Sequence, residues 1–337
     1  MQTIYKSNII RTNNLFSKKS MNTNRRMIHG NYSLVTEFIL EGLTNRPELQ
    51  IPLFFLFLGI YVVTIVANLG LITLISLNSH LHTPMYYFLF NLSFVDICYS
   101  SVFTPKMLIN FVVEKNTISY TGCLTQLYFF CFFVITECYI LTAMAYDRYV
   151  AICKPLLYNV ILSPRICAVF VFGAYVMGCW GSLAHTLCMA RLTFCDANLV
   201  NHYLCDILPV LQLSCTSTYN NEVVVFVLVG MNIVVSTSTT FVSYGFIIAN
   251  ILRISSTQGR AKAFNTCSSH IMTVSLFFGA AAFMYMQPSD VESMDKGKVA
   301  SVFYTNVGPM LNPLIYSLRN KDVKLALKKT LKRNLFS

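Results

Sequence analysis

The sequence contains few charged residues and a single tryptophan. Charged residues make up 12% of the 337 positions, whereas a soluble domain carries about 25%. Hydrophobic residues make up 55%, and the mean hydropathy is +0.57. This scarcity of charge excludes an ordinary soluble domain, so the composition predicts a membrane protein.

Signatures of enzymes and of zinc domains are also missing. The sequence has no HExxH, GxSxG, GxGxxG or P-loop lysine motif, and its 12 cysteines form no CxxC pair. Transporters usually show paired broken helices in two related halves, and no such repeat occurs here. We therefore expect a protein that is not an enzyme and that holds no metal array.

Long apolar runs are abundant instead. Seven of them can cross about 30 Å of hydrocarbon as helices, which rise about 1.5 Å per residue. Open sheets cannot span lipid, so the fold class is an all-α membrane protein, a seven-transmembrane helix bundle within residues 52–319. The expected helices cover residues 52–77, 85–105, 123–145, 166–190, 223–252, 263–287 and 299–318.

The N-terminal segment, residues 1–51, is expected to lie outside the cell. Residues 1–29 contain six basic residues and no acid. This stretch is either a disordered tail or an extension upstream of a natural start at Met21 or Met27. Asn31 opens an Asn-Tyr-Ser glycosylation sequon, which can be used only on the luminal side.

The C-terminal segment, residues 320–337, is rich in lysine. It places Val323, Leu327 and Leu331 four residues apart, with lysines on the other side. This pattern predicts a short amphipathic helix on the inner leaflet of the membrane.

Lysine and arginine set the expected orientation. If the chain before the first helix is outside, the inner segments hold 13 of the 25 basic residues, the outer segments six and the leading tail six. The tail lies more than 20 residues from the first helix and is too distant to count. We therefore expect a multi-pass plasma-membrane protein with an extracellular N-terminus and a cytoplasmic C-terminus.

Four cysteines fall on the outer side: Cys123, Cys195, Cys205 and Cys215. Outer thiols in an oxidising compartment favour two disulfides, and the sequence alone allows three pairings. Cys188, at the outer end of the fourth helix, is a fifth candidate. The stretch from His202 to Asp206 also resembles a metal site, provided that the thiol of Cys205 is free.

Five polar residues interrupt the apolar helices: Asn68, Asp96, Glu137, His270 and Asn312. Asn68, Asp96 and Glu137 form a predicted interior polar cluster. Asp96 and Glu137 could share a proton or hold a sodium ion. The structural alternative is hydrogen bonding between helices.

The stretch 144–153, M-A-Y-D-R-Y-V-A-I-C, closes the third apolar run with a guanidinium. Arg148 follows Glu137 by eleven residues, so the two side chains lie nearly in line on one helix. One interpretation is a stop-transfer charge, and the other is a functional group facing the bundle interior. Pro313 should kink the last helix near the cytosol and make it a candidate for a two-state element.

Together these features resemble a rhodopsin-like G-protein-coupled receptor. The Asp147-Arg148-Tyr149 triplet, Asn312-Pro313-x-x-Tyr316 and the outer Cys123 carry this resemblance. Further motifs at 81–86, 144–153, 243–244, 262–270 and 309–313 are similar to those of class II, tetrapod-type, olfactory receptors. The resemblance covers residues 31–333.

The resemblance implies Cys123–Cys205 and Cys195–Cys215 disulfides. It also implies a pocket for a volatile, mostly apolar odorant between helices three, five, six and seven. Helical spacing on the third helix fits this pocket, and it fits a plain core equally well. The implied wall consists of Phe130, Cys131, Val134, Ile135, Leu228, Asn232, Phe278, Ala281, Ala282, Tyr285 and Thr305.

The same resemblance implies coupling to a heterotrimeric olfactory stimulatory G protein that raises cyclic AMP. The implied switch consists of Asp147, Arg148, Tyr149, Tyr244, His270, Asn312, Pro313 and Tyr316. Phe278 stands where the family usually has tyrosine, which removes a hydroxyl near the pocket floor.

Two alternatives remain open from the sequence. One is a rhodopsin-like receptor for a non-odorant ligand, such as a peptide or an amine. An amine receptor would need a carboxylate in the outer half of the third helix. Phe130 and Cys131 occupy that region, and Glu137 lies too deep. A membrane transporter or channel is the alternative from a different functional class.

Overall fold

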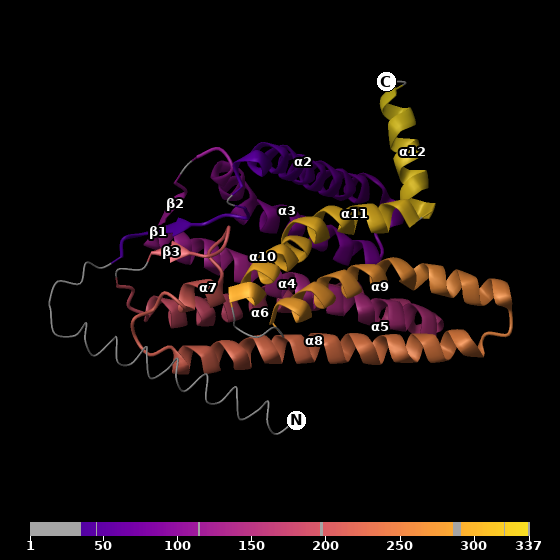
Figure 1. Ribbon diagram of the computed structural model, residues 1–337. Helices are drawn as coiled ribbons and strands as arrows, with labels where there is room; N and C mark the ends of the chain where they lie inside the picture. Colours follow the sequence, from indigo (N-terminus) through magenta and orange to yellow (C-terminus); the bar gives the residue numbers. More distant parts are fainter. Residues whose placement is uncertain are drawn as a thin grey trace, which may run out of the picture.

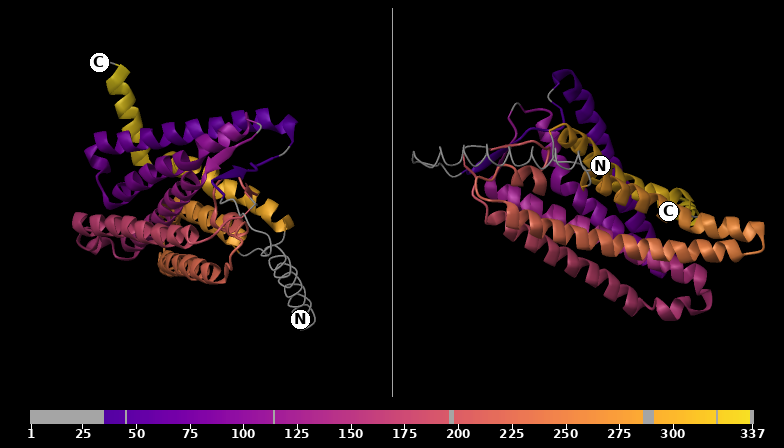
Figure 2. Two further views of the ribbon diagram at one scale, coloured as in Figure 1. Left: turned by 90° about the vertical axis from the view of Figure 1, so that its left-hand side faces the viewer. Right: turned by 60° about the horizontal axis from the view of Figure 1, so that its bottom comes forward.

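The computed structural model describes residues 35–44, 46–113, 115–195, 198–285, 291–319 and 321–335. Seven long helical segments lie side by side in a single bundle (Figures 1 and 2). Three short strands lie at one end of the bundle and the last helix, α12, at the other (Figure 1). We call these the strand end and the α12 end.

Among the described residues, five helices are long and apolar enough to span a membrane. Three of them, α2, α3 and α6, begin with proline in the first turn, where the missing N–H group costs no helical hydrogen bond. Ser119 caps α4 by accepting a hydrogen bond from the Gly122 amide at 3.0 Å. The five are α2 (Pro47–Leu77), α3 (Pro84–Asn110), α4 (Tyr120–Cys153), α6 (Pro164–Ala190) and α8 (Tyr219–Arg253).

The two remaining predicted spans are also helical. The sixth is α9 (Thr257–Tyr285), whose apolar part is His270–Ala280. The seventh consists of α10 (Val291–Val302), a π-helical turn (Phe303–Val307) and α11 (Gly308–Arg319). Pro313 lies inside α11. Each of the seven predicted spans therefore has a helical counterpart.

The small sheet is an addition that the apolar pattern does not predict. Strand β1 (Glu37–Leu40) lies between β2 (Thr117–Ser119) and β3 (Leu199–Val200). It pairs antiparallel with β2, with Glu37 opposite Ser119, and parallel with β3, with Ile39 opposite Leu199. The segment before α2 is thus hydrogen-bonded across the strand end.

Short helices fill the connections. They are the 3₁₀ turns Ser79–Leu81 and Pro155–Leu157, α5 (Tyr158–Ile161) and α7 (Ile207–Leu211). The C-terminal helix α12 (Lys321–Leu335) follows α11, as the sequence predicts, and it turns away from α11 (Figure 1). Val323 and Ala326 are its buried side chains among those described, whereas Leu327 is 49% exposed. Val323 of the predicted apolar face therefore packs against the bundle, and the contact of this face with the membrane stays a prediction.

α4 is the central helix and packs most extensively against α6. A Cβ atom on Gly178 would lie 2.8 Å from the Phe132 carbonyl oxygen. A glycine at this position therefore allows the two helices to approach closely, which is the usual way that membrane helices pack. The buried apolar residues form two main clusters, one toward each end of the bundle.

Candidate functional site

Two disulfides close the strand end. Cys123 at the start of α4 is bonded to Cys205 in the α6–α8 connection, and Cys195 is bonded to Cys215 within that connection. Both pairings implied by the family resemblance are confirmed, and Cys188 is free. Because Cys205 is oxidised, its thiolate cannot bind a metal. No group of three potential metal ligands occurs among the described residues.

The loop that carries Cys205 covers the bundle at this end. Gln126 of α4 accepts a hydrogen bond from the Cys205 amide at 2.9 Å. The hydroxyl of the fully buried Tyr203 lies 2.8 Å from Ser301 Oγ and 2.9 Å from Thr305 Oγ1. The loop is thus hydrogen-bonded to α4 and to the seventh helical segment, and it covers the bundle between them. We call this loop, which carries Tyr203 and Cys205, the roof.

Two titratable residues of this loop are buried. Burial, together with the positive charge of Lys298, lowers the pKa of His202 to about 3, so the imidazole is neutral. Burial raises the pKa of Asp206 to about 6, although the Ile207 amide donates to its Oδ1 atom at 2.7 Å. Its Oδ2 atom has no hydrogen-bond partner among the described residues. The charged form of each of these two side chains therefore destabilises the folded state.

An ion pair joins the N-terminal segment to the seventh helical segment. Lys298 Nζ of α10 donates to Glu41 Oε2, just after β1, at 3.1 Å. Lys298 is only 7% exposed. A buried ammonium needs such a partner, so Glu41 helps to hold α10 under the sheet.

The implied odorant wall is only partly placed. Phe130, Cys131, Ile135 and Thr305 are buried. Phe130 packs on Tyr99 and Phe103 of α3, with ring centroids 5.7 and 6.4 Å apart, and so belongs to an aromatic core. Val134, Leu228, Asn232 and Phe278 are half-buried. The side chains of Ala281, Ala282 and Tyr285 lie outside the described parts of the structure. The same holds for Asn31 and residues 1–29.

Asn232 of α8 carries an unused acceptor. Its Nδ2 atom donates to the Leu228 carbonyl at 2.7 Å. Its Oδ1 atom is buried and has no hydrogen-bond partner among the residues that the structure describes. Thr305 is different, because its hydroxyl already contacts Ser301, Tyr203 and Asn306.

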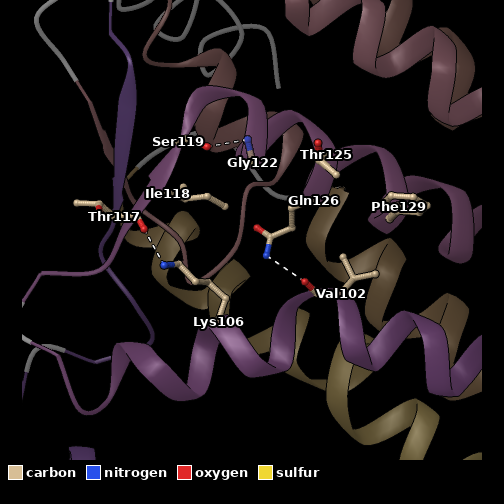
Figure 3. A pocket seen from close by; sticks show the side chains of 9 residues that line it. All are labelled: Val102, Lys106, Thr117, Ile118, Ser119, Gly122, Thr125, Gln126 and Phe129. Carbon is tan, nitrogen blue, oxygen red and sulfur yellow. Dashed lines mark hydrogen bonds between the residues drawn. The ribbon is translucent and has the colours of Figure 1, made fainter.

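A cavity of about 460 Å³ lies between α3, α4 and β2 (Figure 3). We call it the α3–α4 groove. None of the eleven predicted wall residues lines it. Lys106 of α3 reaches across it and donates to the Thr117 carbonyl at 2.6 Å. It is therefore separate from the implied odorant site.

Asn312 joins the two interior acids. Its Nδ2 atom lies 3.2 and 3.1 Å from the Asp96 carboxylate oxygens and 3.3 Å from Glu137 Oε1. Asn68 instead donates to the Thr64 and Pro309 carbonyls, at 2.9 and 3.0 Å. The cluster that the structure brings together is therefore Asp96, Glu137 and Asn312, while Asn68 ties α2 to α11.

At the α12 end, Asp147 holds its neighbour Arg148. Both Nε and Nη2 of Arg148 donate to Asp147 Oδ2, with the Nε bond at 2.8 Å. Tyr158 of α5 donates to Asp147 Oδ1 at 2.6 Å. Burial and the Asp147 carboxylate raise the pKa of Tyr158, so its hydroxyl keeps the proton that it donates. The guanidinium is thus neutralised within its own helix.

Three more of the implied switch residues, Tyr244, His270 and Tyr316, lie close enough to Arg148 to feel its charge. The hydroxyl of Tyr244 on α8 is hydrogen-bonded to His270 Nδ1, and His270 Nε2 lies 3.1 Å from the Leu141 carbonyl. The ring centroids of His270 and Tyr316 are 6.5 Å apart. Tyr149 contacts Phe246 of α8 with its ring. Helices α4, α8, α9 and α11 therefore converge around one buried arginine.

Several contact residues were missed by the sequence reasoning. Tyr158, Tyr203 and Gln126 make side-chain bonds that fix the two ends, as do Glu41 and Lys298. Tyrosine and glutamine at helix or loop positions carry no periodic signal. A lysine in an outer connection indicates orientation but not its partner.

Comparisons with known proteins agree on one family. A family model described as "Olfactory receptor" matches residues 57–334. The chain is 73% identical to olfactory receptor 8B3 of Mus musculus over 90% of this chain and 96% of that protein. It is 69% identical to olfactory receptor 8B3 of Homo sapiens over 92% and 100%. Squid rhodopsin has a similar fold, with a TM-score of 0.66, 18% identity, and coverage of 86% and 87%.

Proposed function

Because the chain belongs to the olfactory receptor family of G-protein-coupled receptors, we propose that it detects a volatile, mostly apolar odorant and activates an olfactory stimulatory G protein. Members of this family are receptors rather than enzymes, and the chain is a multi-pass membrane protein. The proposed orientation places the strand end outside the cell and the α12 end in the cytosol, as the distribution of lysine and arginine favours. The proposed output is a rise in cyclic AMP.

The closed arrangement at Arg148 is the observation that carries this proposal. Asp147 accepts bonds from both Arg148 and Tyr158, and Arg148 is 7% exposed. A partner that needs this guanidinium must first separate it from Asp147. A ligand drives that change only by binding the open state more tightly than the closed one. We assign Arg148, with Tyr244 and Tyr316, to contact with the G protein.

The chemistry of the implied pocket favours a ligand of low polarity. Cys131, Val134, Ile135 and Leu228 offer apolar surface, and Asn232 Oδ1 offers an unused acceptor. An apolar pocket with one or two placed polar groups recognises shape first and a hydrogen bond second. An odorant with one hydroxyl or amine donor matches this set.

We further propose that Asp96 and Glu137 share one proton or hold one sodium ion. The single NH₂ group of Asn312 has two hydrogens for the three carboxylate oxygens within 3.3 Å. Glu137 Oε2 is buried and has no partner among the described residues. Two ionised acids at this site would therefore repel each other without a proton or cation. Glu137→Gln should change basal signalling or its dependence on sodium, and no change in either would leave only a structural role.

The function is tested by expressing the chain in cells with a cyclic AMP reporter and an odorant panel. We expect at least one odorant to raise cyclic AMP. Arg148→Ala should abolish the response at unchanged surface level, because it removes the buried cation that the G protein would contact. Odorant-driven ion or solute flux in cells that lack G protein would contradict the proposal.

A further inference from the structure

The α3–α4 groove lies apart from both the implied odorant wall and the Arg148 switch. Its walls come from the last two turns of α3, the first turns of α4 and strand β2. It is an open groove on the side of the bundle rather than an enclosed cavity, and its volume is about 460 Å³. The proposed function gives this groove no role.

The groove opens toward lipid. Phe129 on the α4 side is 43% exposed. On α3, Ile109 lies three residues after Lys106, on the same helical face, and is 45% exposed. Exposed apolar side chains on helices of membrane-spanning length are covered by hydrocarbon. A lipid in the bilayer can therefore reach the groove from its Phe129 side.

The length of the groove is comparable with the thickness of one leaflet of a bilayer. Ser119 caps α4 at the strand end, and Phe129 lies ten residues further along, which is about 15 Å along a helix axis. Half of a bilayer, with its headgroup layer, is about 20 Å thick. The groove is therefore long enough to extend from the headgroup layer into the acyl chains of one leaflet.

The charge of the groove lies at its β2 end. Lys106 is the one charged residue among the described residues that line it, and Figure 3 shows it directed toward β2, away from Phe129. An ammonium has three donors, and the described bond to the Thr117 carbonyl uses one of them. The hydroxyls of Ser119 and Thr125 also line the groove. The groove is thus cationic at the β2 end, and its other end has the apolar side chains of Val102 and Phe129 beside Gln126, whose Nε2 atom donates to the Val102 carbonyl at 3.3 Å.

We propose that the α3–α4 groove binds one membrane glycerophospholipid, with its phosphodiester at Lys106 and an acyl chain along Val102 and Phe129. The phosphodiester is anionic and accepts hydrogen bonds, so it complements the ammonium and the hydroxyls. The acyl chain matches the apolar side chains of Val102 and Phe129. The α4 wall also carries Gln126, which bonds to the Cys205 amide, so the bound lipid lies beside the attachment of the roof.

The test uses the fact that Trp180, exposed on α6, is the single tryptophan. A Trp180→Phe/Phe129→Trp double variant places one fluorophore at the end of the groove away from β2. The full-length protein in maltoside micelles is titrated with phosphatidylcholine carrying brominated chains, which quench tryptophan on contact. Diacylglycerol with the same brominated chains is the comparison, because it lacks the phosphodiester.

We expect phosphatidylcholine to quench the introduced tryptophan at a lower mole fraction than diacylglycerol, by about twofold to fivefold, as for one partly exposed ion pair. Lys106→Gln should remove this preference, and Lys106→Arg should keep it. Lys115→Gln is the matched control, since Lys115 is exposed in the same α3–β2 connection but does not line the groove. It should leave the preference unchanged.

Equal quenching by both lipids, with no effect of Lys106→Gln, would overturn the proposal and show ordinary contact with bulk lipid. Equal loss of the preference in Lys106→Gln and Lys115→Gln would also overturn it, because a general charge effect would then explain the result. Retention of the Cys123–Cys205 disulfide in each variant establishes that the fold is intact. The measurement uses no odorant and no G protein, so its outcome is independent of the proposed function.

Discussion

The two ends of the bundle are held together by different kinds of bond. The strand end has two disulfides, a three-stranded sheet and the Glu41–Lys298 ion pair. At the α12 end, the structure describes free cysteines and a small set of side-chain hydrogen bonds around Asp147 and His270. A disulfide contributes about 2–5 kcal/mol, whereas a hydrogen bond contributes about 1 kcal/mol. The strand end is therefore built to stay fixed and the α12 end to change.

The largest expected effect comes from breaking the strand end covalently. Cys205→Ser should lower stability by about 2–5 kcal/mol and prevent surface expression, because the roof loses its bond to α4. Surface labelling and the apparent Tm in detergent measure this. Cys188→Ser, which removes a free outer thiol, should behave like the wild type. Normal surface expression of Cys205→Ser would show that the sheet and hydrogen bonds suffice.

The next largest effect is a loss of stability at low pH. His202 has a folded pKa of about 3, below its ordinary value near 6.5, so its contribution to stability falls as the pH drops below 6.5. The loss reaches about 2 kcal/mol at pH 5. Asp206 opposes it, because a folded pKa raised to about 6 gives stability that is present at low pH and lost as the pH rises through 6.

Two variants separate these contributions. Between pH 7.5 and 5, His202→Asn should lose less apparent Tm than the wild type, and Asp206→Asn should lose more. His80→Asn changes an exposed histidine at the α12 end and should follow the wild type. Identical pH profiles for His202→Asn and the wild type would show that His202 does not control the acid stability of the strand end.

A smaller effect is expected from the ion pair across the sheet. Glu41→Gln should lower stability by about 1 kcal/mol, because it removes the carboxylate that pairs with the buried Lys298 ammonium. Glu37→Gln is the matched control, since Glu37 is exposed at the start of β1, the strand that Glu41 follows. A double-mutant cycle with Lys298→Met isolates the coupling between the two residues. A coupling energy near zero would contradict the assigned role.

The smallest expected effect concerns a hydrogen bond at the α12 end. Tyr158→Phe removes one bond from Asp147, worth about 1 kcal/mol, and should raise basal cyclic AMP by up to about fivefold with normal stability. Tyr146→Phe is the control, because the Tyr146 ring packs on Tyr149 and Phe170 nearby. Basal signalling that stays unchanged or falls in Tyr158→Phe would show that this bond does not restrain the switch.

Much of the fold follows from the sequence, but the partners within it do not. Apolar length predicts seven helices, and each has a counterpart. That a residue is apolar does not tell whether it packs in the core or contacts lipid. Val66 is 64% exposed, whereas Leu71 on the same helix is 3% exposed. In a membrane both environments favour the same residues. The placement of Phe130 in an aromatic core beside α3 could therefore not be read from helical spacing.

The sequence by itself determined the membrane class, the number of spans and the position of a guanidinium at the end of α4. These properties depend on hydropathy and on rise per residue, which are local. The tertiary structure decided which groups meet. Asn312 reaches Asp96 and Glu137 across 216 and 175 residues, and Glu41 reaches Lys298 across 257. Contacts at such separations depend on how the helices pack, which no local pattern encodes.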